Sequence, residues 1–392
     1  MLALLGLCLA LFFFKLGARP LWNQDEGMHA ATSKGMVLSG DWVTPTLNGE
    51  PFFDKPAFYN WPVALAFVAF GFTEFAARLP SALLGFGCVL VTYRLGRLLY
   101  GPRAGVLGAV VLATAGQFFV LSRIVVHDIS LTFFVTLGLA LWYEGYELEG
   151  RGRHLLMLSY AAFGVAALAK GPLGVLLPGA IVFVFLAARK DLPFIGRMSL
   201  GWGIVIGLAI AAPWYLAVSL RNPGYAHYFF VELNFGSFLS DQPHHPEPIT
   251  YYVPTLLVGF LPWSVFLPVA LVHSWRRRLE DTHGGTLYLL AWAGFILFFF
   301  SLASSKLTTY ILPLFPPLAI LVGRLWDEVI SIAAPGVRRA VLWSFSPFLL
   351  LPAAVAYRIV THRLPLAELA ARQGLTVTVA ALPIVALLVC LG

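Results

Sequence analysis

The sequence predicts an all-α polytopic membrane protein, and two observations support this fold class. Of the 392 residues, 59% are hydrophobic and only 11% are charged, whereas soluble domains carry roughly 25% charged residues. The charged residues also gather in short clusters between long apolar runs, as in proteins that cross a bilayer many times. A water-soluble fold is excluded because the chain lacks the residues for a polar surface. We expect one membrane-embedded domain over residues 1–392.

About twelve apolar runs have the length that a transmembrane helix needs. They fall near residues 1–17, 79–99, 104–122, 129–146, 155–170, 172–188, 200–220, 251–273, 286–303, 307–326, 339–360 and 374–391. The first run has no basic segment before it and no Ala-x-Ala cleavage site after it. We therefore interpret it as an uncleaved span rather than a signal peptide.

One further apolar run, 57–72, decides the topology, because counting it as a span would reverse the side of every later loop. Cytoplasmic loops are enriched in lysine and arginine. If 57–72 does not span, one side of the membrane receives most of the basic residues in short connections: Arg94, Arg97, Arg103, Arg151, Arg153, Arg189, Lys190, Arg197, Arg276, Arg277, Arg278, Arg324, Arg338 and Arg339. This asymmetry favours a non-spanning run and accounts for the net charge of +7 without a nucleic-acid surface.

With this topology the two longest loops, residues 17–78 and 221–250, share the extracytoplasmic side. The first loop is long enough for helices that lie on the membrane surface, and we expect them at 26–38 and 57–72. The protein is then a multi-pass protein of the inner (plasma) membrane. Its unusual polar residues gather on the periplasmic or extracytoplasmic face.

The first polar cluster contains the adjacent carboxylates Asp25 and Glu26, just past the outer end of the first span. Such a pair can act as a general base or bind a divalent cation. Acidic residues also suit the first turn of a helix, where the helix dipole is positive. The sequence leaves the functional and the structural interpretation equally open.

The second cluster contains Asp54 and Lys55, followed by Tyr59 at the start of the non-spanning run. Lys55 can hold a phosphate as a point charge. It can also lie at headgroup level beside interfacial aromatic residues, which is the commoner situation for a lysine considered alone.

The third cluster, His127 and Asp128, lies at the boundary between two spans. Charged residues near span ends usually face protein, water or ligand, because burying charge in the bilayer is costly. Asp128 is therefore a candidate site residue. It can equally cap the helix that follows or pair with Arg123.

The fourth cluster contains Lys306 and Tyr310. These two residues are four apart, so in a helix they share a face and can reach one anion. The alternative is a basic and aromatic anchor at the membrane interface.

The second long loop adds Glu232, His244 and His245. Adjacent histidines are weak evidence for a metal site here, because no third ligand has a diagnostic spacing. Surface residues are the favoured interpretation, and contact with a substrate is the alternative.

The ordered set of motifs resembles a known family. The set comprises Trp-x-x-Asp-Glu-Gly at 22–27, Gly-Asp-Trp at 40–42, Asp-Lys-Pro at 54–56, Ala-Arg-Leu-Pro-Ser-Ala at 77–82, His-Asp at 127–128, Lys-Gly-Pro at 170–172, Pro-Trp-Tyr at 213–215, Leu-Pro-Trp at 261–263 and Ser-Lys-Leu-Thr-Thr-Tyr at 305–310. It is similar to the GT-C glycosyltransferases that use polyprenyl-phosphate sugars, above all the lipid A aminoarabinose transferases within the protein mannosyltransferase group. The resemblance runs from residue 16 to about residue 325.

The resemblance implies a GT-C type bundle of about twelve transmembrane helices with extracytoplasmic juxtamembrane helices. It also implies an enzyme that moves a hexosyl or pentosyl group from a polyprenyl-phosphate donor to a lipid, glycan or protein acceptor. The implied roles are catalytic for Asp25, Glu26 and Asp128, donor-phosphate binding for Lys55, Lys306 and Tyr310, and substrate-cavity lining for Asp54, Tyr59, His127, Glu232, His244 and His245.

The chemistry of such a transfer agrees with these residue types. A polyprenyl phosphate is a good leaving group, so the site needs cations where negative charge collects. Asp25 can take the proton of an acceptor hydroxyl, and a single displacement inverts the anomeric carbon. With an ionised phosphate acceptor, Asp25 would instead orient the acceptor or, with Asp128 or Glu26, hold a divalent metal.

The sequence also departs from the family pattern. Members commonly show Lys-Pro-Pro and Lys-Leu-Pro-x-Tyr, whereas this chain has Lys-Pro-Ala at 55–57 and Lys-Leu-Thr-Thr-Tyr at 306–310. The choice of acceptor therefore does not follow from the resemblance. A transporter or lipid flippase is the alternative function, but it should place its polar groups near the bilayer centre.

Overall fold

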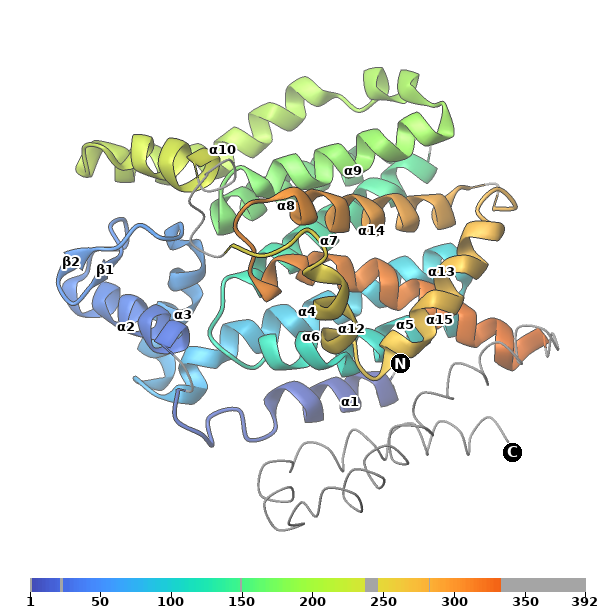
Figure 1. Cartoon of the computed structure of the whole chain (residues 1–392). Coiled ribbons are helices and arrows are strands. Elements are labelled where there is room, and N and C mark those ends of the chain that lie inside the picture. Colours follow the sequence, from blue (N-terminus) through green and yellow to red (C-terminus); the bar gives the residue numbers. More distant parts are fainter. Residues whose placement is uncertain (1, 22–23, 149, 237–245, 282, 333–392) are drawn as a thin grey trace, which may run out of the picture.

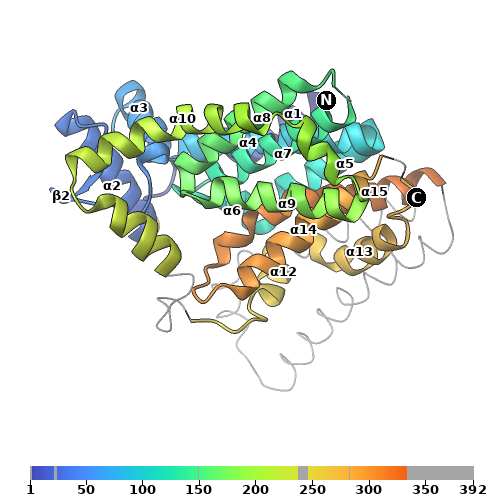
Figure 2. The same cartoon turned by 90° about the horizontal axis from the view of Figure 1, so that it is seen from above.

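The computed structural model describes residues 2–21, 24–148, 150–236, 246–281 and 283–332. Most of these residues are helical. The long helices run side by side, and α2 and α3 lie with the short strands β1 and β2 at one end of the bundle (Figure 1). The view from above shows the same arrangement (Figure 2). We call this end the loop end.

The chain begins with α1 (Leu2–Phe13), which packs along α4 and α5. The loop end follows, with α2 (Gln24–Ser39), β1 (Thr46–Leu47), β2 (Glu50–Pro51), the 3₁₀ helix η1 (Ala57–Tyr59) and α3 (Asn60–Phe70). The strands form an antiparallel hairpin. Asn48 and Gly49, both with positive φ, form its turn, as two-residue hairpin turns require.

The next elements form the centre of the bundle. They are α4 (Glu74–Tyr100), α5 (Pro102–Thr114), α6 (Gly116–Leu121), α7 (Asp128–Glu147), α8 (Arg153–Lys170), α9 (Leu173–Arg189), η2 (Leu192–Arg197) and α10 (Leu200–Arg221). Gly101, with φ 92°, ends α4 and Pro102 begins α5. This pair reverses the chain because glycine accepts positive φ and proline suits the first helical position.

The last described elements close the bundle. They are the π-helical segment η3 (His227–Gly236), α12 (Tyr252–Gly259), η4 (Trp263–Phe266), α13 (Leu267–Arg276), α14 (Gly285–Leu302), η5 (Thr308–Leu314) and α15 (Phe315–Ile332). Most buried apolar residues form one core through the bundle. A second, smaller core under the loop end includes Met36, Ala57, Trp214 and Tyr225.

The non-spanning interpretation of 57–72 is supported by the length of α3. Its 11 residues extend only about 17 Å, about half of the roughly 30 Å hydrocarbon layer. The helix packs on α2 and α4. The structure also confirms a helix at the predicted 26–38 segment, where it has α2.

Several predicted spans are helical as expected, but two are broken. The predicted 104–122 span is divided into α5 and α6, and the predicted 251–273 span bends by 116° between α12 and the η4–α13 helix. The breaks meet: the amide of Gly116 donates to the carbonyl of Leu261 across 2.8 Å. Backbone groups freed by each break thus find partners in the other.

By length and composition, four helices of the described chain can each cross a membrane: Glu74–Tyr100, Leu200–Arg221, Gly285–Leu302 and Thr308–Ser331. The bent pair would be a fifth. The predicted spans 339–360 and 374–391 lie outside the described residues. The number twelve therefore stays a prediction.

Candidate functional site

Asp25 and Glu26 begin α2, but the structure gives them different surroundings. Asp25 is exposed, whereas Glu26 is 1% exposed. Arg78 of α4 donates to both carboxylate oxygens of Glu26, at 2.6 and 2.9 Å, and the amide of Val125 donates at 3.1 Å. Glu26 therefore ties α2 to the bundle. The predicted catalytic or metal-binding role of Glu26 does not fit this geometry.

Asp128 begins α7 and forms a buried ion pair with Lys170, the last residue of α8. The Lys170 ammonium lies 4.2 Å from the ring centroid of Tyr310, close enough for a cation–π contact. Three elements, α7, α8 and η5, therefore meet at one charged pair.

The alternative pairing of Asp128 with Arg123 is wrong. Arg123 instead donates to the carbonyl oxygens of Leu11 and Phe14 at the end of α1, where helix carbonyls lack intrahelical partners. Lys170 appeared in the sequence only as part of a motif. Its pairing could not be found locally because 42 residues separate it from Asp128.

His29 is a second residue of this region that no sequence motif indicated. It follows Asp25 by four residues on α2, so both lie on one face of the helix. Its ring centroid is 4.3 Å from that of His127. The ring of Tyr59 also packs on His127, with the two centroids 4.8 Å apart. His29 could have been identified from the sequence because it lies four residues, about one helical turn, after the candidate carboxylate Asp25.

Burial favours the neutral form of both histidines. Burial lowers the pKa of His29 below its ordinary 6.5, although the nearby carboxylates of Asp54 and Asp25 act to raise it. Burial lowers the pKa of His127 well below 6.5, and the positive charges of Lys55 and Lys170 act in the same direction. Within the described chain, neither ring nitrogen of His127 has a hydrogen-bond partner.

Lys55 is the more accessible cation of the cluster. Its ammonium bonds the carboxylate of the adjacent Asp54 at 3.0 Å, and both side chains are partly exposed. The charge of Lys55 acts on His29, Asp128 and Tyr310. We use "transfer cluster" for Asp25, His29, Asp54, Lys55, His127, Asp128, Lys170 and Tyr310.

Two predicted residues are used in packing rather than left free for a ligand. Tyr59 is fully buried, and its hydroxyl meets Ser81 at 2.5 Å and the amide of Val126 at 3.2 Å. Lys306 is also buried. Its ammonium donates to the carbonyls of Ala303 and Glu247, at 2.5 and 3.0 Å, and its predicted phosphate contact stays a prediction.

The remaining predicted residues come from the second long loop. Glu232 lies on η3 and pairs with His227 at 3.0 Å, both side chains being exposed. His244 and His245 lie outside the described residues.

The residues of the described chain do not form a metal site. No three histidine, cysteine, aspartate or glutamate side chains of residues 2–332 that the structure places are arranged to hold an ion. Asp25 and Asp128 are the two predicted metal ligands, and the carboxylate of Asp128 is already paired with the ammonium of Lys170. The predicted divalent metal therefore has no supporting ligand set there.

Comparisons with known proteins agree with the motifs. The sequence model of the dolichyl-phosphate-mannose-protein mannosyltransferase family matches residues 54–216. The chain is 34% identical over 319 residues to an undecaprenyl phosphate-alpha-4-amino-4-deoxy-L-arabinose arabinosyl transferase of Edwardsiella ictaluri, covering 80% of this chain and 56% of that protein. The transferase of the same name from Aeromonas hydrophila is 35% identical over 320 residues, with 80% and 58% covered.

Solved structures show the same relation. ArnT from Cupriavidus metallidurans, bound to undecaprenyl phosphate, superposes with a TM-score of 0.82 at 30% identity, covering 93% of this chain and 65% of that one. An oligosaccharyltransferase of Archaeoglobus fulgidus, with a TM-score of 0.60 at 16% identity and coverage of 88% and 54%, shares the fold alone.

The chain spans a little over half the length of these curated relatives. Within that length the ordered motifs, the matched sequence family and the superposition agree. The protein is a multi-pass membrane protein. Over this length the chain is similar in sequence and in fold to the aminoarabinose transferases, and in sequence to the protein mannosyltransferases.

Proposed function

We propose that this protein transfers a sugar from a polyprenyl-phosphate donor to a lipid, glycan or protein acceptor. The names of its relatives support an undecaprenyl-phosphate donor that carries an aminopentose. The proposal depends most on one observation. Three kinds of charged group surround His29 and His127 at one end of the bundle. They are the exposed carboxylate of Asp25, the accessible ammonium of Lys55 and the buried Asp128–Lys170 pair.

The donor phosphate would bind at Lys55. This ammonium is held only by its neighbour Asp54 among the described residues and is partly exposed, so a phosphate can replace part of that contact. As the bond from the anomeric carbon to the phosphate oxygen breaks, the leaving phosphate gains negative charge. A fixed cation next to it lowers the energy of the transition state. Tyr310, close to Lys170, would line the same region.

Asp25 would act as the general base. An acceptor hydroxyl oxygen attacks the anomeric carbon, its proton passes to the Asp25 carboxylate, and the polyprenyl phosphate departs with the bonding electrons. This single displacement inverts the anomeric carbon. His29, on the same face of α2, is neutral and can accept a hydrogen bond from the acceptor at one ring nitrogen.

The reaction would occur at the extracytoplasmic face of the inner membrane, in a bundle of about twelve helices. Two features support this orientation. In the sequence, the short connections between the predicted spans carry most of the arginines on one side of the membrane, which favours a cytoplasmic location for that side. The loop end carries the surface helix α3, which is too short to span.

The first prediction tests the base. Asp25→Asn keeps the size of the side chain but removes the proton acceptor, so transfer should fall by about 10²- to 10⁴-fold. The measurement is transfer of labelled sugar from a polyprenyl-phosphate donor by the purified full chain in liposomes. Glu50→Gln is the matched control, because Glu50 is an exposed carboxylate of the same loop, and it should leave the rate unchanged.

Two outcomes would contradict the proposal. Full activity of Asp25→Asn would remove Asp25 from the role of base. Movement of the intact donor across the liposome membrane without transfer would instead support the flippase alternative, for which the position of the cluster at one end of the bundle is a poor match.

A further inference from the structure

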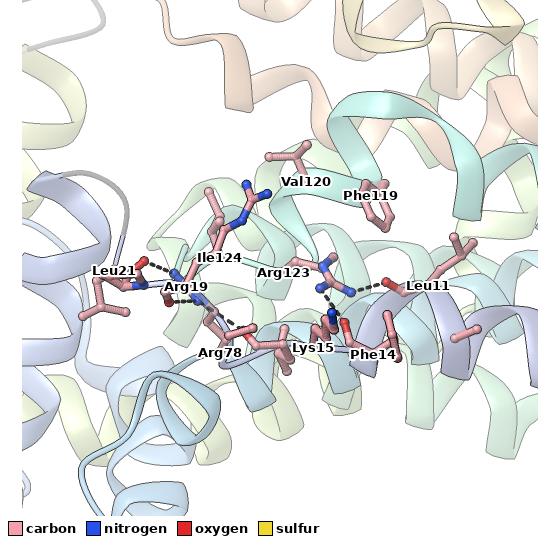
Figure 3. Close-up of a pocket in the computed structure, with 14 residues that line it drawn as sticks. Leu11, Phe14, Lys15, Arg19, Leu21, Arg78, Phe119, Val120, Arg123 and Ile124 are labelled. Carbon is pink, nitrogen blue, oxygen red and sulfur yellow. Dashed lines mark hydrogen bonds between the residues drawn. The ribbon is translucent and has the colours of Figure 1, made fainter. Parts of the chain in front are cut away.

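A cavity lies at the C-terminal end of α1. Its volume is about 870 Å³, and it is lined by α1, the following segment 14–21, α6 and residues 123–124. None of the transfer-cluster residues lines it. Figure 3 shows Lys15, Arg19, Arg78 and Arg123 around this cavity together with apolar side chains of α1 and α6.

Arg78 is fully used by the protein. Its five N–H groups meet five acceptors: both carboxylate oxygens of Glu26 and the carbonyls of Leu16, Arg19 and Pro20. Figure 3 shows Arg78 with the segment that carries these carbonyls. Glu26 also neutralises its charge. Arg78 therefore shapes the cavity and has no donor left for a ligand.

The other cations differ from Arg78 in this respect. Arg123 gives two N–H groups to the carbonyls of Leu11 and Phe14, so three of its five remain. Lys15 and Arg19 are exposed. In the part of the chain that the structure describes, Lys15, Arg19 and Arg123 make no ion pair with a carboxylate. The cavity therefore carries three uncompensated positive charges.

Below these charges the cavity is apolar. Leu11 and Phe14 form one wall, and Phe119, Val120 and Ile124 form the other. Phe14 is 66% exposed and Val120 is 40% exposed. In a chain that spans a membrane, such surfaces face lipid. A molecule that fits must have an anionic head, an apolar tail and access from the bilayer.

We propose that this cavity binds an anionic phospholipid of the bilayer. Its phosphate lies among Lys15, Arg19 and Arg123, and an acyl chain lies along α1 and α6. This site is separate from the transfer cluster and goes beyond the proposed function. The bound lipid holds α1 against the bundle through Arg123, which already caps α1.

The test measures binding without turnover. The full chain in detergent is titrated with phosphatidylglycerol, with phosphatidylcholine of the same chains and with undecaprenyl phosphate, and bound lipid is counted by native mass spectrometry. The variant is Lys15→Asn with Arg19→Gln. Asparagine suits position 15 because Lys15 has a φ of 52°. Arg151→Gln with Arg153→Gln, two exposed arginines at the opposite end, is the matched control.

Phosphatidylglycerol should bind the double variant about 25-fold more weakly, since each of the two basic residues near an anionic lipid contributes about fivefold. The control and Arg19→Lys should bind it as the native chain does, phosphatidylcholine should bind weakly to all, and undecaprenyl phosphate binding should not change. The variant's thermal unfolding midpoint verifies its fold.

Three outcomes would overturn the proposal. Phosphatidylglycerol could bind the native chain and the double variant equally. The control could lose as much binding as the variant, which would indicate unspecific attraction. The variant could lose undecaprenyl phosphate instead, which would make the cavity a donor site. None of these outcomes depends on sugar transfer, so they are distinct from a failure of the proposed function.

Discussion

Asp128 and Lys170 show how a buried charge can be tolerated at the end of two spans. Both side chains of the ion pair are buried. Removing either partner would leave an uncompensated buried charge, which typically costs about 3–5 kcal/mol. We therefore expect the pair to hold α7 and α8 together, and the more accessible Lys55 and Asp25 to contact substrates.

The second prediction concerns Lys55. Lys55→Ala removes the accessible cation of the transfer cluster, and charge-assisted hydrogen bonds contribute about 1.5–3 kcal/mol. Affinity for undecaprenyl phosphate should fall roughly 10- to 100-fold, measured by binding of labelled lipid to the purified chain. Lys34→Ala is the control, since Lys34 is an exposed lysine of α2. Unchanged donor affinity in Lys55→Ala would refute the phosphate assignment.

The third prediction concerns His127 and pH. Its pKa in the folded protein lies well below 6.5, whereas in the unfolded chain it is about 6.5. Below pH 6.5 the unfolded state binds a proton that the folded state does not, so stability falls as the pH drops from 6.5 towards the folded pKa. Above pH 6.5 the histidine contributes no pH dependence.

The measurement is the thermal unfolding midpoint in detergent between pH 5 and pH 8. The native chain should lose stability on the acid side, and His127→Phe should lose less. His154→Gln, at an exposed histidine, should follow the native profile. An acid loss as steep in His127→Phe as in the native chain would show that other groups cause it.

The sequence predicted individual residues of the site unevenly, for a physical reason. Asp25, Asp54 and Lys55 could be singled out because they stand in short polar motifs. His29 and Lys170 acquire their positions through contacts with His127 and Asp128, which lie far away in the chain, so no local pattern reveals them. The same limit applied to Glu26, whose partner Arg78 is 52 residues away.

At the level of elements, close packing between α5 and α15 depends on glycine. A Cβ atom on Gly323 would lie 2.3 Å from the backbone nitrogen of Gly108 and 2.9 Å from the carbonyl of Ala104. Small residues allow membrane helices to approach this closely. Because both clashing atoms are backbone, the helices themselves would have to separate to admit a methyl group.

The fourth prediction follows from this contact. Gly323→Ala should destabilise the protein by about 1–3 kcal/mol, seen as a lower unfolding midpoint in detergent. Gly294→Ala, within α14 and with no atom within 4 Å of the added Cβ, should unfold at or above the native midpoint. Equal midpoints for the two variants would show that α5 and α15 are not packed as described.

Element boundaries show the same division between local and distant causes. The non-spanning helix at 57–72 was predicted from the distribution of basic residues along the chain. The breaks in 104–122 and 251–273 were not predicted, and they meet in space at the hydrogen bond between Gly116 and Leu261. Apolar periodicity alone makes both segments look continuous.

Across the whole molecule, charge separates the two ends of the bundle. At the end opposite the transfer cluster, Arg94 pairs with Glu144 at 2.7 Å and Arg277 with Glu328 at 2.8 Å. Arg324 donates to Thr286 at 2.5 Å. Arg94 lies in α4, Arg324 in α15 and Arg277 directly after α13, so helices far apart in sequence bring arginines to this end, as the predicted sidedness requires.

The fifth prediction tests this sidedness. In a cysteine-free chain, single cysteines replace Glu50 in the hairpin, Pro223 after α10 and Arg151 between α7 and α8. All three positions are exposed. If 57–72 does not span, a membrane-impermeant maleimide added to intact cells should label positions 50 and 223 and leave position 151 unlabelled until the membrane is opened. If that run does span, positions 50 and 223 fall on opposite sides and only one of them is labelled from outside. That result would divide the transfer cluster between the two faces, because Asp54 and Lys55 precede the run whereas His127 and Asp128 follow it.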